Sequence, residues 1–191
     1  MIELITGPMF SGKSTLLFQK MERYVYAGKR VVLIRPEQDT REFFSHSPLD
    51  TALRNLVKRE KIDIIMVADF LEYRLPEKYD TVFVDEYFMI KNCWHLACGC
   101  SSDRNIYFAG LLATSECKLF DEAIRLLPYC DSIIKLNGVC TRCGSQDGNY
   151  SYYRKGSKNE EIVVGDNEYT CLCRDCYMEL QDEKKSQMQL L

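Results

Sequence analysis

Hydrophobic and polar residues follow two different periods along the chain, and each change of period marks a change of element. Short apolar runs such as Ile2–Thr6 predict buried strands, whereas Leu17, Met21 and Val25 recur at helical spacing and predict a helix that ends at Gly28. Further strands are predicted at 30–34, 62–67, 81–84, 106–109 and 132–136, and further helices at 52–58, 92–100 and 116–127. This alternation predicts an α/β fold with a mostly parallel sheet covered on both faces.

The pattern changes after residue 137. Paired cysteines and a predicted hairpin occupy 138–178, and 179–191 is polar enough to be a flexible tail or a loose helix. The sequence therefore predicts an α/β domain over 1–137 and a small domain over 138–178. The polar segment 36–50 has no periodicity and is interpreted as a functional or disordered loop.

Composition narrows the classes of function. The chain has 191 residues, of which 46% are hydrophobic and 28% charged, and its net charge is −3. The slight excess of acidic over basic residues argues against a broad cationic face that binds nucleic acid. The sequence has no apolar run of membrane-spanning length and begins with a strand instead of a signal pattern, so we expect no membrane partner and a cytoplasmic location.

A phosphate-binding loop follows the first predicted strand. The stretch Gly7-Pro8-Met9-Phe10-Ser11-Gly12-Lys13-Ser14 has glycine, four residues and Gly-Lys-Ser, with a predicted strand before it and a predicted helix after it. Inward-pointing N–H groups and the helix N-terminus form an anion site, with Lys13 on the outer phosphates and Ser14 on Mg²⁺. A glycine-bearing turn with a solvated lysine is the alternative. The motif predicts a nucleotide as a ligand, and Thr15 continues it into the helix.

Two carboxylates end the buried run 81–84. Asp85 and Glu86 lie at the C-terminal tip of that predicted strand, where ligands bind in open α/β sheets. Asp85 can hold Mg²⁺, and Glu86 can act as a general base or orient a water molecule. Two solvent-exposed acids that cap a loop are the alternative.

Cysteine spacing predicts a metal site. Without a signal pattern, ten cysteines favour reduced thiols and metal ligation over disulfides. Two Cys-x-x-Cys pairs are spaced as in tetrahedral Zn²⁺ sites. Cys171 competes with Cys173 as a ligand, and a redox dithiol or uncommitted thiols are the alternatives. The predicted ligands are Cys140, Cys143, Cys173 and Cys176.

These motifs occur in the order seen in type II thymidine kinases, which contain zinc. The chain resembles that family over residues 1–177, through the phosphate loop, Asp39-Thr40-Arg41, Asp85-Glu86 and both cysteine pairs. The resemblance implies a RecA-like ATP-binding domain and a zinc domain whose long loop, the lasso, folds over the nucleoside. It also implies a homotetramer that is inhibited by its end product, dTTP.

The resemblance assigns further roles by position. It implies that Asp39 and Arg41 organise metal and phosphates and that Glu86 takes the proton from the 5′-hydroxyl of the nucleoside. The resemblance therefore assigns catalytic roles to Glu86, Lys13 and Arg41. The implied base-pocket residues are Met9, Leu111, Phe120 and the lasso residues Val163, Val164, Gly165 and Tyr169.

Three stretches depart from the family pattern. Tyr87-Phe88-Met89-Ile90 replaces Gly-Gln-Phe-Phe, Leu111–Ser115 replaces Leu-Asp-Gly-Thr-Phe, and Val164-Gly165 replaces Gly-Gly. We therefore expect Phe88 or Tyr87 to replace a lost aromatic residue of the base pocket, and we assign Phe88 to that pocket. The changes also leave two other functions to be weighed: an ATPase with a zinc module, and a nucleotide-binding protein that has lost catalysis.

Overall fold

A parallel sheet forms the centre of the protein. The computed structural model describes residues 1–39, 50–60, 62–99, 104–154 and 168–188. In this part of the chain six strands form one sheet in the order β3-β2-β4-β5-β1-β6, and every neighbouring pair is parallel. The strands are β1 (Ile2–Thr6), β2 (Val31–Pro36), β3 (Asp63–Val67), β4 (Thr81–Asp85), β5 (Asn105–Gly110) and β6 (Ser132–Lys135).

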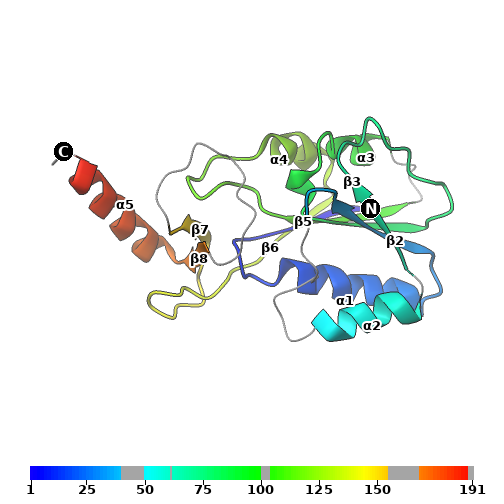
Figure 1. Ribbon diagram of the computed structural model, residues 1–191, viewed down its shortest axis with the longest axis horizontal. Helices are drawn as coiled ribbons and strands as arrows, with labels where there is room; N and C mark the ends of the chain where they lie inside the picture. Colours follow the sequence, from blue (N-terminus) through cyan, green and yellow to red (C-terminus); the bar gives the residue numbers. More distant parts are fainter. Residues whose placement is uncertain (40–49, 61, 100–103, 155–167, 189–191) are drawn as a thin grey trace.

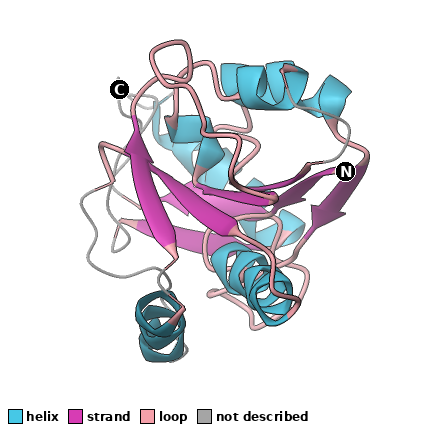
Figure 2. Ribbon diagram, turned by 90° about the vertical axis from the view of Figure 1, so that its right-hand side faces the viewer, coloured by secondary structure: helices cyan, strands magenta, loops and turns pink. Residues whose placement is uncertain are grey.

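Helices cover both faces of this sheet (Figures 1 and 2). In Figure 1, α1 (Lys13–Tyr26) and α2 (Asp50–Arg59) lie below the sheet, and α3 (Trp94–Cys98) and α4 (Asp121–Leu126) lie above it. Two short 3₁₀ turns, η1 (Tyr87–Met89) and η2 (Leu127–Tyr129), follow β4 and α4. The predicted α/β fold with a parallel sheet is confirmed.

Each face of the sheet has its own hydrophobic core. Strand residues such as Leu33 and Phe83 pack with Leu17 and Phe18 of α1, and their neighbours on the opposite face pack with α3 and α4. Residues of the inner strands β2 and β4 are buried on both sides, because parallel sheets are covered twice.

Several predicted boundaries were wrong. The helix predicted over 116–127 begins only at Asp121, because Thr114 Oγ1 accepts bonds from the N–H groups of Glu116 and Lys118 and closes a turn there. The helix predicted over 92–100 covers only Trp94–Cys98, and β2 continues through Pro36.

The C-terminal region contains a second, two-stranded sheet. Strands β7 (Tyr150–Tyr153) and β8 (Tyr169–Leu172) form the predicted hairpin, and α5 (Arg174–Met188) follows, so residues 179–188 are helical. Tyr152, Leu172 and Tyr177 form a small core with three cysteines. Figure 1 shows α5 projecting away from the central sheet.

In the part of the chain that the structure describes, no helix combines the length and the hydrophobicity that crossing a membrane requires.

Candidate active site and metal centre

The loop 7–14 connects β1 to α1 as the motif requires. Gly12 has φ +81°, a left-handed conformation that favours glycine, and the Gly12 carbonyl accepts the first helical hydrogen bond from Leu16 N–H. The ammonium of Lys13 donates to the carbonyl of Pro8 at 2.7 Å. This bond holds the Lys13 side chain back across its own loop, and the residue is buried.

The same loop contains a buried polar atom that a ligand could satisfy. Among the described residues, Ser11 Oγ has no hydrogen-bond partner although it is shielded from solvent. Buried hydroxyls are nearly always paired, so an unpaired one next to a helix N-terminus suits an anion such as a phosphate group. The loop therefore fits the phosphates of a nucleotide.

Ser14 and Asp85 meet beside this loop. Ser14 Oγ donates a hydrogen bond to Asp85 Oδ1 at 3.1 Å, although the two residues are 71 positions apart. Asp85 is the last residue of β4 and is only 2% exposed. A hydroxyl and a carboxylate in contact at the edge of a phosphate loop form the oxygen pair that holds Mg²⁺ in phosphate-loop enzymes.

Glu86 leaves the strand in a strained backbone conformation. Its φ is +52°, in the left-handed region that non-glycine residues seldom adopt, and it begins the turn η1. Such outliers often occur at functional sites, where the surrounding structure enforces them. The Glu86 side chain is half-buried, next to the buried Asp85.

Asp39 lies beyond the end of β2, the strand next to β4. It accepts a bond from Arg35 Nη2 at 2.8 Å in a buried ion pair, which sequence patterns did not reveal. The neighbouring Gln38 donates to the carbonyl of Met89 at 2.7 Å and so joins this segment to η1. Asp39 thus follows one strand and Asp85 ends its neighbour, at the same edge of the sheet.

Aromatic residues gather where the base pocket was predicted. The rings of Phe88 and Phe120 are stacked with centroids 4.6 Å apart, each residue is 8% exposed, and Leu111 packs against the same cluster. The Tyr87 hydroxyl donates to the carbonyl of Leu111 at 2.9 Å. The structure therefore brings together three of the predicted base-pocket residues.

The other predicted nucleoside contacts are placed only in part. Met9 is half-buried in the phosphate loop, and Tyr169 begins β8 with its ring 5.3 Å from that of Tyr153. Four predicted site residues lie outside the described residues, namely Arg41, Val163, Val164 and Gly165.

Four cysteines converge in the C-terminal region. The Sγ atoms of Cys140, Cys143, Cys173 and Cys176 all lie within 4.8 Å of one another. The Sγ atoms of Cys143 and Cys173 are 3.7 Å apart. A tetrahedral Zn²⁺ site with bonds of about 2.3 Å places its sulfur atoms about 3.8 Å apart, so the cluster fits zinc.

Local hydrogen bonds favour thiolate formation at one ligand. Burial opposes the ionisation of Cys140, but backbone N–H groups of Cys173, Cys143 and Arg142 outweigh it and lower the pKa of Cys140 to about 6. Cys171 lies outside the cluster, and burial raises its pKa to about 11. Of the two cysteines that competed in the sequence, Cys173 is the one in the cluster.

Two contacts from the cysteine-containing region were not foreseen. Ser151 Oγ accepts a hydrogen bond from the N–H of Met9 at 3.0 Å, and the Tyr177 hydroxyl donates to the carbonyl of Ser115 at 2.9 Å. The first contact reaches the phosphate loop and the second reaches the loop after Leu111. No motif includes Ser151. Tyr177 ends the stretch Cys173–Tyr177 that carries part of the resemblance, but nothing in that stretch indicates a contact with Ser115, so sequence patterns could not identify either contact.

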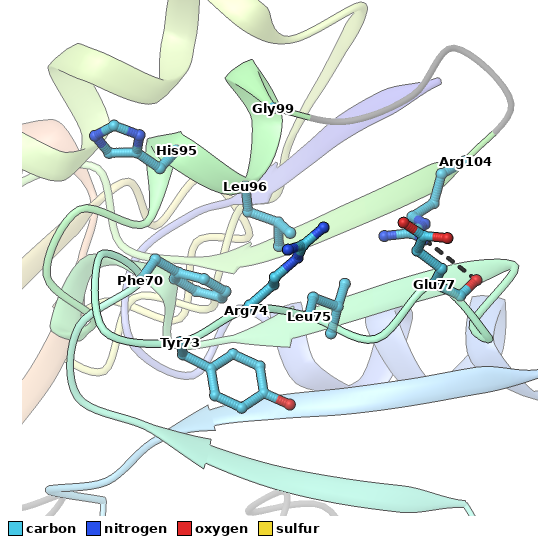
Figure 3. Close-up of a pocket in the computed structure, with 9 residues that line it drawn as sticks. All are labelled: Phe70, Tyr73, Arg74, Leu75, Glu77, His95, Leu96, Gly99 and Arg104. Atoms are coloured by element: carbon cyan, nitrogen blue, oxygen red, sulfur yellow. Dashed lines mark hydrogen bonds between the residues drawn. The ribbon is translucent and has the colours of Figure 1, made fainter.

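A separate cavity of about 580 Å³ lies between the β3–β4 connection and α3. Figure 3 shows side chains from both segments converging on it, including Phe70, Arg74 and Leu96. Arg104 and Glu77 on its rim precede β5 and β4, whereas the phosphate loop follows the end of β1. None of the predicted site residues lines this cavity.

Comparison with known proteins agrees with these features. A family model described as thymidine kinase matches residues 1–177. The thymidine kinase of Pseudothermotoga lettingae is 31% identical over 92% of this chain and 94% of its own length. The thymidine kinase of raccoon poxvirus is 31% identical over 93% of this chain and 96% of its own length. The cytosolic thymidine kinase of Gallus gallus is 27% identical over 96% of this chain and 79% of its own length.

Proposed function

The chain belongs to the thymidine kinase family, and on that premise we propose that it transfers the terminal phosphate of ATP to the 5′-hydroxyl of thymidine. The observation that carries the proposal is the 3.1 Å hydrogen bond between Ser14 Oγ and Asp85 Oδ1. It joins the residue after the phosphate-loop lysine to the residue before the proposed base, Glu86. A phosphoryl donor and its acceptor would therefore meet between the phosphate loop and the tip of β4.

The phosphate loop binds ATP in this account. Its N–H groups and the helix N-terminus of α1 hold the phosphates, and Lys13 leaves the Pro8 carbonyl to pair with the outer ones. Ser14 and Asp85 would hold Mg²⁺, which supplies charge neutralisation on the phosphates when bound. Asp39 and Arg41 supply further charges around the metal and the phosphates. Phosphoryl transfer depends mainly on such positioning and charge.

Glu86 acts as the general base. A carboxylate beside the metal-holding Asp85 can accept the proton of the 5′-hydroxyl as the oxygen attacks the γ-phosphate. The left-handed backbone at Glu86 turns the chain immediately after β4. The adjacent carboxylates of Asp85 and Glu86 can therefore have different roles, Asp85 in holding Mg²⁺ and Glu86 as the base.

The nucleoside base packs against the aromatic cluster. Phe88 and Phe120 offer a stacked apolar wall, and Leu111 adjoins it. Met9, Tyr169 and the lasso residues Val163, Val164 and Gly165 complete the pocket in the proposal. Phe88 stands where the family pattern has glutamine, so this wall is more apolar than in relatives that keep the pattern.

A Zn²⁺ ion holds the C-terminal region together. Cys140, Cys143, Cys173 and Cys176 would be its ligands, and the spacing of their sulfur atoms supports this assignment. Such sites replace a large hydrophobic core in small modules. The hairpin β7–β8 and the first turn of α5 would depend on it.

We extend the proposal to assembly and regulation by family membership alone. The protein forms a homotetramer in the cytoplasm, and the triphosphate end product dTTP inhibits it by occupying the nucleoside site.

Incubation with ATP, Mg²⁺ and each deoxynucleoside in turn tests the proposed function. Mass spectrometry should detect the monophosphate of thymidine. Product with a different nucleoside only would overturn the assignment of thymidine. Tight binding of nucleotides without any product, or ATP hydrolysis without transfer, would overturn the kinase assignment itself.

A further inference from the structure

The C-terminal hairpin makes direct contact with the phosphate loop. Met9 is the third residue of that loop, and its N–H donates a 3.0 Å hydrogen bond to Oγ of Ser151, which is 142 positions away in β7. We propose that Ser151 is a positioning residue that fixes the phosphate loop in its ATP-binding shape. The inference rests on the proposed binding of ATP by this loop.

The two faces of the β7–β8 hairpin pack against different parts of the protein. Ser151 lies opposite Cys171 in the antiparallel pair β7–β8, and directly opposed residues project from the same face. Both are buried, with exposures of 8% and 1%. Residues next to them in the strands, Tyr152 and Leu172, pack with the cysteine cluster instead. One face thus meets the phosphate loop while the other builds the metal centre.

Close packing leaves the hairpin little freedom to move. A Cβ added to Gly138 or Gly148 would lie 2.7 Å or 2.5 Å from Cys171 Sγ. The two glycines also exchange backbone hydrogen bonds of 2.8 Å and 2.9 Å. The Cβ of Gly138 would lie 3.6 Å from the carbonyl oxygen of Met9, so this glycine pair fits between Cys171 and the phosphate loop.

The bond to Ser151 settles where one N–H group of the loop points. In a phosphate loop the N–H groups that bind phosphate point inward. The N–H of Met9 is instead engaged by the hairpin, so it anchors the outer side of the loop. Without that anchor the loop would adopt the binding-competent shape for a smaller fraction of the time. The apparent affinity for ATP would fall in proportion to the loss of that population.

Ser151→Ala tests this role through ATP binding in the absence of nucleoside. Calorimetry with Mg²⁺ present should give an ATP Kd roughly three- to tenfold higher than in the wild type, the effect of losing one hydrogen bond. Ser151→Thr keeps a hydroxyl and should restore most of the affinity. Zinc content and Tm should remain close to the wild-type values, because the metal face of the hairpin is unchanged.

Ser145→Ala is the matched control. Ser145 lies in the same cysteine-containing region and also accepts a bond from a backbone N–H, that of Asp147. Among the described residues, the side-chain hydrogen bonds of Ser145 involve Asp147 and not the phosphate loop. Its ATP Kd should stay at the wild-type value. An unchanged Kd for Ser151→Ala, or an equal rise for both variants, would overturn the inference.

The test separates this inference from the proposed function. A wild-type protein that does not bind ATP would overturn both. A wild-type protein that binds ATP but transfers no phosphate to thymidine would overturn the proposed function alone. Weaker ATP binding by Ser151→Ala than by Ser145→Ala would then still support the positioning role.

Discussion

Ser14 and Asp85 are joined by a 3.1 Å hydrogen bond between the start of α1 and the end of β4. The bond crosses the carboxyl-terminal edge of the sheet, because the phosphate loop follows β1 and Asp85 ends β4. In the proposed function this pair of oxygens receives Mg²⁺. The pair therefore connects the fold to the reaction more directly than any other contact described above.

Asp85→Asn should weaken the response to Mg²⁺. An amide keeps the shape of the side chain but removes the charge, so we expect the Mg²⁺ concentration for half-maximal rate to rise about 10- to 100-fold. Asp80→Asn is the control, because Asp80 immediately precedes β4 at the other end of the strand and pairs with Arg30. Equal Mg²⁺ requirements in both variants would contradict the metal role of Asp85.

Glu86→Gln should lower kcat about 10²- to 10⁴-fold, the usual contribution of a general base. The Kd for ATP should stay within about twofold of the wild type, because glutamine is isosteric and the phosphate loop is intact. Stopped-flow or steady-state assays with saturating ATP measure kcat. Glu116→Gln, in the loop after Leu111, is the control, and an unchanged kcat in Glu86→Gln would remove Glu86 from the role of base.

Phe88→Leu should raise the KM for thymidine roughly three- to tenfold and leave the KM for ATP nearly constant, since an aromatic pair is worth about 0.5–1.5 kcal/mol. The matched variant is Phe83→Leu. Phe83 stacks on Tyr107 with centroids 5.1 Å apart, in the core on the opposite face of the sheet. Both variants should lose some stability, so a similar KM for thymidine in the two would refute a direct role of Phe88.

Cys173→Ala should reduce the zinc content from about one ion per chain to near zero, because three thiolates hold zinc more weakly than four. Cys171→Ala should retain the metal, since Cys171 lies outside the cluster. Elemental analysis of the purified variants measures the zinc. Retention by Cys173→Ala together with loss by Cys171→Ala would reverse the assignment.

The local pattern of residues was sufficient for much of the fold. Apolar runs alternating with helical repeats located all six strands of the sheet. The signal is strongest for the inner strands β2 and β4, which are buried on both faces and therefore read as continuous apolar runs. The helix predicted from Glu116 failed for a local reason. Its apolar spacing is helical, but Thr114 closes a turn and Cys117 has φ +62°, so the backbone cannot enter the helix there.

Contacts between distant segments were harder to foresee. The paired cysteines could be identified from spacing alone, yet the choice between Cys171 and Cys173 needed the hairpin, in which Cys171 lies opposite Ser151 and outside the cluster. The ion pair of Arg35 with Asp39 and the bond from Met9 to Ser151 have no sequence motif. They follow from how the strands and the hairpin pack, which local patterns do not specify.

Labelled ATP gives the sharpest test of phosphoryl transfer to the 5′-oxygen of thymidine. Incubation of the wild-type protein with γ-labelled ATP, Mg²⁺ and thymidine should give labelled thymidine 5′-monophosphate. The analogue 5′-deoxythymidine, which lacks the accepting hydroxyl, should give no labelled nucleotide. Label that appears only as inorganic phosphate, or remains in ATP, would rule out phosphoryl transfer to thymidine.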